Sequence, residues 1–145
     1  MGQSIGMTST RKGNTYMSFT LPQIEEIFDK NNFAVLVRDL KRLGVLSYEY
    51  NLQIGEYTFY GADGHQEVMK SNGLELVPVE KTDTVAIQQV VKKFQNHDLA
   101  FSEMAKELAS LGIFSWETNL EKLSVEFFNH KGEVAYREVF ASVFD

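Results

Sequence analysis

Six polar side chains are the candidates for a binding or catalytic site, because strand alternation places them on one face of a predicted sheet: Glu49, Asn51, Tyr60, His65, Glu117 and Asn119. Glu49 and Glu117 hold equivalent places in two similar segments, and two carboxylates on facing strands can raise each other's pKa and serve acid–base chemistry. His65 follows Asp63 and Gly64, and an Asp–His pair can supply a base with its orienting group. One hypothesis is therefore a small-molecule binder or enzyme whose cleft lies between the two segments.

The alternative is that these side chains form an ordinary solvated face, which is usual for an antiparallel sheet covered on one side. The same alternation adds other, mostly polar residues to this outer face: Ser47, Glu56, Thr58, Glu67, Ser115, Glu126, Phe128 and Glu133. Asp63 and Gly64 are also typical hairpin-turn residues, and no nucleophile motif accompanies His65. The three histidines lack the HxxxH and HExxH spacings of zinc sites. We therefore favour the solvated face and predict no catalytic residue, no metal and no cofactor.

Aromatic residues fall on both faces of the predicted strands. Tyr48 and Trp116 share their parity with apolar neighbours, which predicts that both lie in the core under the helices. Tyr60 and Phe128 have the opposite parity, and exposed aromatics of this kind can anchor a ligand or a partner.

Hydrophobic periodicity predicts two helices followed by three strands, twice over. The first helix begins near Thr20, and the second is capped by Asn32 and stopped by Gly44. The next helix is capped by Asp83 or Thr84, and the last one ends at Gly112. The predicted strands are residues 45–52, 56–60, 65–69, 113–120, 123–128 and 133–137. Residues 71–81 suggest an edge strand, and residues 138–144 fit either a strand or one helical turn.

A sequence repeat organises these elements. Residues 40–64 recur at 108–132 with nine identities in 25 positions, where average composition gives roughly one or two. The sequence thus predicts an α+β fold made by tandem duplication of a helix-helix-strand-strand-strand unit, with an antiparallel sheet and helices on one face. Residues 1–17 are predicted to be a disordered leader, and residues 18–145 one globular domain of two repeats, about 20–80 and 83–145.

Charge and composition exclude several classes of partner. The net charge of −6 and the pI near 5.1 argue against nucleic-acid binding, which depends on Lys and Arg. The chain has no cysteine, which removes disulfides and thiolate metal sites. No apolar run approaches the roughly 20 residues that span a bilayer, and residues 1–17 lack the apolar stretch of a secretory signal. We predict a cytoplasmic protein that contacts neither membrane nor nucleic acid.

Three segments resemble a known family. The run Leu40-Lys-Arg-Leu-Gly-Val-Leu-Ser-Tyr-Glu49, the turn Tyr60-Gly-Ala-Asp-Gly-His65, and residues 101–119 are similar to the YbcV/YdfO-like family of uncharacterised bacterial and prophage proteins, often labelled phage envelope proteins. The resemblance covers about residues 20–138. It implies an α+β domain, a bacterial or prophage source, and no established cofactor or catalytic residue. Because the sequence has a well-formed repeat but no nucleophile motif, metal-ligand spacing or cofactor fingerprint, the leading hypothesis is a non-enzymatic interaction or accessory protein that binds a protein partner or a second copy of itself.

Overall fold

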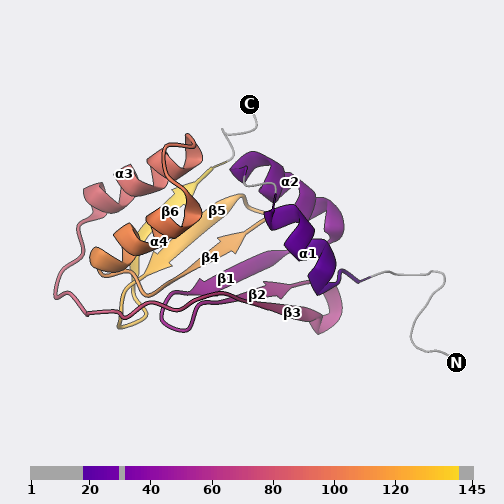
Figure 1. Cartoon of the computed structure of the whole chain (residues 1–145), viewed down its shortest axis with the longest axis horizontal. Coiled ribbons are helices and arrows are strands. Elements are labelled where there is room, and N and C mark those ends of the chain that lie inside the picture. The colour runs from indigo at the N-terminus through magenta and orange to yellow at the C-terminus, as the bar shows by residue number, and fades with distance from the viewer. Residues whose placement is uncertain (1–17, 30–31, 141–145) are drawn as a thin grey trace, which may run out of the picture.

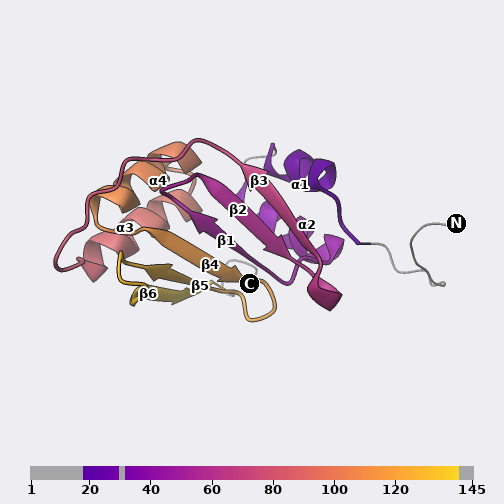
Figure 2. The same cartoon turned by 90° about the horizontal axis from the view of Figure 1, so that it is seen from below.

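The computed structural model describes residues 18–29 and 32–140, so the leader predicted for residues 1–17 lies outside the described residues. Within them, the chain runs α1 (Leu21–Phe28), α2 (Phe33–Leu43), β1 (Ser47–Asn51), β2 (Glu56–Tyr60), a short 3-10 turn (Ala62–Gly64) and β3 (Gln66–Lys70). It continues with α3 (Thr84–Gln95), α4 (Phe101–Ser110), β4 (Ser115–Asn119), β5 (Ser124–Phe128) and β6 (Val134–Val139). We call α1 to β3 the first half and α3 to β6 the second half. The helices cover one face of the sheet (Figure 1), and the other face is bare of helices (Figure 2). The predicted α+β class is confirmed.

The six strands of residues 18–29 and 32–140 form one antiparallel sheet in the order β3-β2-β1-β4-β5-β6. The first strands of the two halves, β1 and β4, pair at the centre of the sheet. From there each half continues to its own edge in chain order, β1-β2-β3 on one side and β4-β5-β6 on the other. In the central register Glu49 lies opposite Glu117. The two positions that correspond in the sequence repeat are therefore direct cross-strand partners.

The helix boundaries follow the predicted capping residues. The Asn32 side chain accepts a hydrogen bond from Val35 N at 3.1 Å, and Asp83 does the same for Ala86 N at 3.0 Å. Gly44 and Gly112 end their helical segments with φ values of 102° and 93°, a left-handed conformation that favours glycine.

The segment between the halves differs from the sequence-based expectation. Residues 71–79 contain no strand, and the sheet edge of the first half is β3. The segment instead crosses the end of the sheet, where Ser71 N donates to Gly55 O at 2.6 Å and Leu74 N donates to Leu52 O at 2.9 Å (Figure 1). It then packs against the end of α4, since a Cβ on Gly112 would overlap the Val79 side chain. At the other end of the chain β6 extends to Val139, and residues 141–145 lie outside the described residues.

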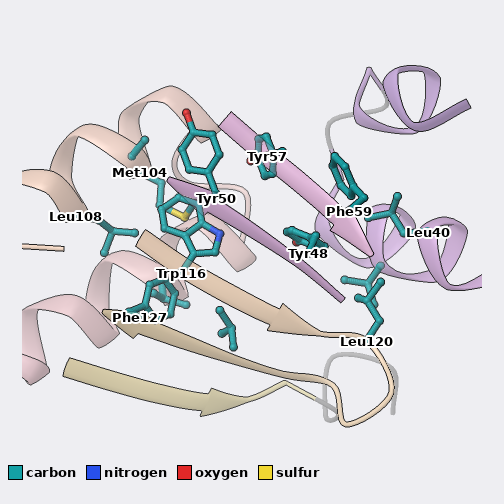
Figure 3. Packing of buried hydrophobic residues seen from close by; sticks show 14 of the residues in the cluster. Leu40, Tyr48, Tyr50, Tyr57, Phe59, Met104, Leu108, Trp116, Leu120 and Phe127 are labelled. Atoms are coloured by element: carbon teal, nitrogen blue, oxygen red, sulfur yellow. The ribbon is translucent and has the colours of Figure 1, made fainter. Parts of the chain in front are cut away.

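The core lies between the helices and the inner face of the sheet. One cross-strand row of large side chains runs over the six strands of the described residues, each residue directly opposite the next: Met69, Tyr57, Tyr50, Trp116, Phe127 and Tyr136. Figure 3 shows its middle four members, from Tyr57 to Phe127. Tyr48 and Trp116 are 5% and 4% exposed, which confirms the prediction that both belong to the core. Buried residues of both halves belong to the same hydrophobic cluster.

Candidate ligand-binding cavity

Three of the six predicted site residues meet on the outer face of the sheet. Glu49 and Glu117 are cross-strand partners, and Glu117 lies opposite Glu126 on β5. The Tyr60 hydroxyl donates a hydrogen bond to Glu49 Oε1 at 2.7 Å. Glu126 has a partial counter-charge in Arg137, whose Nε lies 3.9 Å from Glu126 Oε2. The centre of the outer face is thus a row of three carboxylates with one hydroxyl donor.

The carboxylate row changes the ionisation of its central member, Glu117. Partial burial raises the pKa of Glu117, and the charges of Glu49 and Glu126 raise it further. A carboxyl with a raised pKa holds its proton more tightly in the folded chain, so its ionisation lowers the free energy of unfolding as the pH rises above 4.5. The pKa of Tyr60 is raised to about 12, chiefly by its hydrogen bond to Glu49, so at neutral pH Tyr60 is a donor.

Asn51 and Asn119 occupy matching positions in the two tight turns that follow β1 and β4. Asn51 Oδ1 accepts from the backbone N–H groups of Gln53 and Ile54, at 2.9 and 3.2 Å. Asn119 Oδ1 accepts from the two residues at the same spacing, at 3.0 and 2.8 Å. Both amides have a structural role, because they satisfy backbone donors of the turns.

The placement of His65 corrects one expectation. Strand alternation puts His65 and Glu67 on the outer face, but the register sets Glu67 opposite the buried Phe59, on the helix side. The 3-10 turn Ala62–Gly64, with Asp63 at a φ of 59°, changes the direction of the chain and so breaks the alternation. His65 Nε2 lies 2.8 Å from Phe19 O and 3.3 Å from Glu67 Oε2, and its ring packs edge-on against Phe19. His65 therefore ties the chain before α1 to the edge of the sheet, away from Glu49 and Glu117.

A cavity of about 550 Å³ lies on the opposite side of the sheet, under the helices. Its floor is the inner face of the sheet, with Tyr48, Tyr57, Trp116, Thr118, Val125 and Phe127. One wall comes from the first half, through Phe28, Phe33 and Leu36. The other comes from the second half, through Val91, Phe94, Phe101 and Met104. None of the six residues predicted from the sequence lines it.

The two halves meet around this cavity through aromatic rings. Phe33 of α2 packs edge-on against Phe94 of α3, with ring centroids 5.9 Å apart, and against Phe140, with centroids 5.2 Å apart. Phe101 of α4 packs against Trp116 on the floor, at 6.0 Å. The mouth of the cavity lies between α3 and α4, where the lining residues are exposed: His97, Asp98, Ala100 and Glu103. The space therefore depends on both halves and is open to solvent on one side.

The polar groups of the floor are few and mostly donors. Burial raises the pKa of Tyr48 to about 12, and the Thr118 side chain is its hydrogen-bond partner. Burial also raises the pKa of Tyr57 well above its ordinary value, with smaller contributions from the neighbouring tyrosines. Among the described residues, neither the Tyr57 hydroxyl nor the Trp116 indole N–H has a hydrogen-bond partner. No Lys or Arg belongs to the described lining, and its ionisable residues besides tyrosine are at the mouth.

The sequence predicted Tyr48 and Trp116 for the core, and its alternative hypothesis of a cleft between the two halves named other residues than those that line this cavity. One signal was present in the sequence. Tyr48, Tyr50 and Tyr57 all have core-facing parity, and a buried tyrosine hydroxyl needs a partner. Tyr50 has one in Ser71, whose Oγ lies 2.9 Å from the Tyr50 hydroxyl. Several tyrosines on one core-facing surface indicate polar contacts or space above that surface.

One family matches the chain over residues 23–139, and its description is protein of unknown function, DUF1398. The chain belongs to this family. The match fits the predicted resemblance to an uncharacterised family, and the YbcV/YdfO-like assignment stays a prediction. No curated protein matches the chain. Within the described residues no helix is long and apolar enough to cross a bilayer, and no three His, Cys, Asp or Glu residues are placed to hold a metal ion.

Proposed function

We propose that the protein is a non-enzymatic binding protein that holds a small, largely apolar molecule in the cavity between its two halves. The observation that carries the proposal is the cavity itself: about 550 Å³, floored by the sheet and walled by helices of both halves. Pockets for small molecules typically measure about 300–1,000 Å³ and combine apolar walls with a few placed polar groups. The aromatic walls and the few hydroxyl and N–H groups of the floor fit that description.

The chemistry of the lining supports binding rather than catalysis. Tyr48, with a pKa of about 12, and Tyr57, with a pKa well above its ordinary value, stay protonated at neutral pH, so they are hydrogen-bond donors and poor bases. The other ionisable residues of the described lining, His97, Asp98 and Glu103, are exposed at the mouth. Glu49 and Glu117, the pair suited to acid–base chemistry, are on the other face of the sheet.

We also infer that residues 18–145 are one domain made of two copies of a single unit. Three features support this: both halves have the same element order, Asn51 and Asn119 cap equivalent turns, and Glu49 and Glu117 face each other at the centre of the sheet. An experimental structure in which the two halves do not superimpose over helices and strands would contradict the duplication.

Ligand binding is tested with N-phenyl-1-naphthylamine, an uncharged probe whose fluorescence rises in apolar surroundings. Trp116, the single tryptophan of the chain, lies on the cavity floor and provides a second signal, because the bound probe takes up its emission. We expect saturable binding with one probe per chain. Ala100→Tyr places bulk in the mouth and should weaken binding at least tenfold, whereas Ser102→Tyr, on an exposed residue of the same helical turn outside the lining, should not. Equal probe affinity in both variants would contradict the proposed site.

Self-association is the second candidate, and it retains the prediction of a partner-binding accessory protein. Both edge strands carry exposed valines: Val68 on β3 is 37% exposed, and Val134 and Val139 on β6 are 50% and 56% exposed. Exposed apolar residues at a sheet edge favour pairing with another chain. Sedimentation equilibrium tests this, since a dimer should become monomeric in Val68→Lys or Val139→Lys. A monomer at high concentration would remove this candidate.

The bacterial or prophage origin, the cytoplasmic location and the lack of nucleic-acid binding stay predictions, the last supported by the net charge of −6.

A further inference from the structure

We infer that the ligand of this cavity is an uncharged ring-bearing molecule with a hydrogen-bond acceptor, which receives hydrogen bonds from the Tyr57 hydroxyl or the Trp116 indole N–H. The inference rests on the proposed function, and it adds the chemical class of the ligand. Three observations on the lining carry it: a buried hydroxyl and a buried N–H that have no partner among the residues the structure describes, and the sign of the charges around them.

Tyr57 is the first donor. It lines the cavity, is 4% exposed, and packs against Tyr50 and Phe28 with ring centroids 4.2 and 5.1 Å away. Its hydroxyl has no partner among the described residues, whereas Tyr50, its direct neighbour on β1, bonds to Ser71. Buried hydroxyls nearly always have a partner, so a hydroxyl without one beside a cavity indicates that something in the cavity supplies it.

Trp116 is the second donor. It lies in the same cross-strand row, beyond Tyr50, and is 4% exposed. Its ring packs against Phe127 with centroids 5.7 Å apart, and Figure 3 shows the indole nitrogen turned toward the side of the cluster where Tyr48 lies. An indole N–H can only donate, so its partner must be an acceptor such as a carbonyl, an ether or a ring nitrogen.

The charges around the cavity determine the charge of the ligand. No Lys or Arg belongs to the described lining, and the acidic residues at the mouth, Asp98 and Glu103, repel anions. A buried carboxylate or phosphate would therefore be unpaired, which is costly. A cation would stack well on aromatic rings but would face the positive ends of the Tyr57 and Trp116 donors. An uncharged ring system with an acceptor atom satisfies both the apolar walls and the donors.

The test uses four probes of nearly equal size, each displacing N-phenyl-1-naphthylamine: naphthalene, quinoline, 2-naphthoate and N-methylquinolinium. Quinoline differs from naphthalene by one ring nitrogen, which accepts a hydrogen bond. The preference is the ratio of the naphthalene to the quinoline dissociation constant. We expect Tyr57→Phe or Trp116→Phe to lower this preference about fivefold, the worth of one hydrogen bond. The matched control is Tyr50→Phe, which removes a hydroxyl that already has a protein partner and should leave the preference unchanged.

The outcomes separate this inference from the proposed function. If N-phenyl-1-naphthylamine binds but neither Tyr57→Phe nor Trp116→Phe lowers the preference, the acceptor inference is overturned and the proposed cavity function stands. The inference is also overturned if 2-naphthoate or N-methylquinolinium displaces the probe at lower concentration than quinoline. If N-phenyl-1-naphthylamine does not bind at all, the proposed function itself fails. Thermal melts confirm that each variant is folded, and using two variants keeps the test decisive if one of them does not fold.

Discussion

Replacing Tyr57 with phenylalanine should stabilise the ligand-free protein, which is the opposite of what removing a buried polar group usually does. The residue is 4% exposed and its hydroxyl has no protein partner among the described residues, so folding removes most of its contact with water and those residues supply no hydrogen bond in return. That loss costs roughly 1–3 kcal/mol. Tyr57→Phe keeps the ring and its packing against Phe28 and Tyr50. We expect the free energy of unfolding to rise by about 1 kcal/mol.

Tyr50→Phe is the matched comparison, because it removes the same atom from the neighbouring strand. The Tyr50 hydroxyl lies 2.9 Å from Ser71 Oγ, and losing that hydrogen bond should cost about 1 kcal/mol. The two variants should therefore differ by about 2 kcal/mol, which corresponds to about 6 °C in melting temperature for a chain of this size. Urea unfolding at pH 7, followed by the emission of Trp116, measures both free energies.

The pH dependence provides an independent check. The pKa of Tyr57 is held well above 10 in the folded chain, so the native state keeps a proton that the unfolded chain loses, and stability falls as the pH rises past 10. Tyr57→Phe should lose stability less steeply there than the parent protein. If Tyr57→Phe is instead destabilised as much as Tyr50→Phe, the Tyr57 hydroxyl has a partner in the ligand-free protein. The argument for an acceptor on the ligand would then lose its first donor.

Two further predictions concern the outer face and the helix ends. Glu117→Gln removes the central charge of the carboxylate row and should raise the free energy of unfolding at pH 7 by about 0.5 kcal/mol at low salt. Because the pKa of Glu117 is raised on folding, this gain should shrink as the pH falls toward 4.5 and in 1 M salt, and a gain that is constant with pH would contradict the charge argument. Gly44→Ala should cost about 1 kcal/mol for its positive φ alone, and Gly112→Ala about 3 kcal/mol, because its Cβ also overlaps Val79. Equal losses in chemical denaturation would show that the linker does not pack on Gly112 as described.

Local signals in the sequence predicted most of the elements correctly. Asn32 and Asp83 cap helices because each side chain accepts a hydrogen bond from the backbone N–H three residues later. Such a short range can be recognised from sequence spacing. Strand alternation is also a local pattern, and it correctly placed Tyr48 and Trp116 on the inner face. The parity of His65 was wrong, because a 3-10 turn of three residues separates it from β2 and resets the alternation. The path of residues 71–79 depends on backbone contacts with the β1–β2 turn, which no local pattern records.

The site was harder to predict than the fold. The pairing of Glu49 with Glu117 follows from the repeat together with an antiparallel centre, and the sequence suggested it. The cavity depends instead on how far two helix pairs stand from each other above one sheet. That spacing is set by contacts between the halves, such as Phe33 with Phe94 and Phe140, whose residues are far apart in the sequence. Periodicity identifies which side chains face the core, but it does not show whether the core is filled.

Comparing equivalent positions of the halves suggests that the two unpartnered donors serve function rather than folding. With the repeat offset, Tyr57 corresponds to Val125 and Trp116 to Tyr48, and all four residues line the cavity. A valine fills the place of Tyr57 in the second half, so the fold does not need a hydroxyl there. Tyr48, in the place of Trp116, has a hydrogen-bond partner in Thr118, so that position can be satisfied within the protein. The outer face keeps Glu49 and Glu117 identical, although facing carboxylates repel each other. On the inner face, only one half at each of the two places carries a donor without a protein partner among the described residues. Packing alone would favour, at both positions, either an apolar residue or a polar residue with a hydrogen-bond partner in the protein. Tyr57 and Trp116 are neither within the described residues, and a ligand that carries an acceptor would account for both.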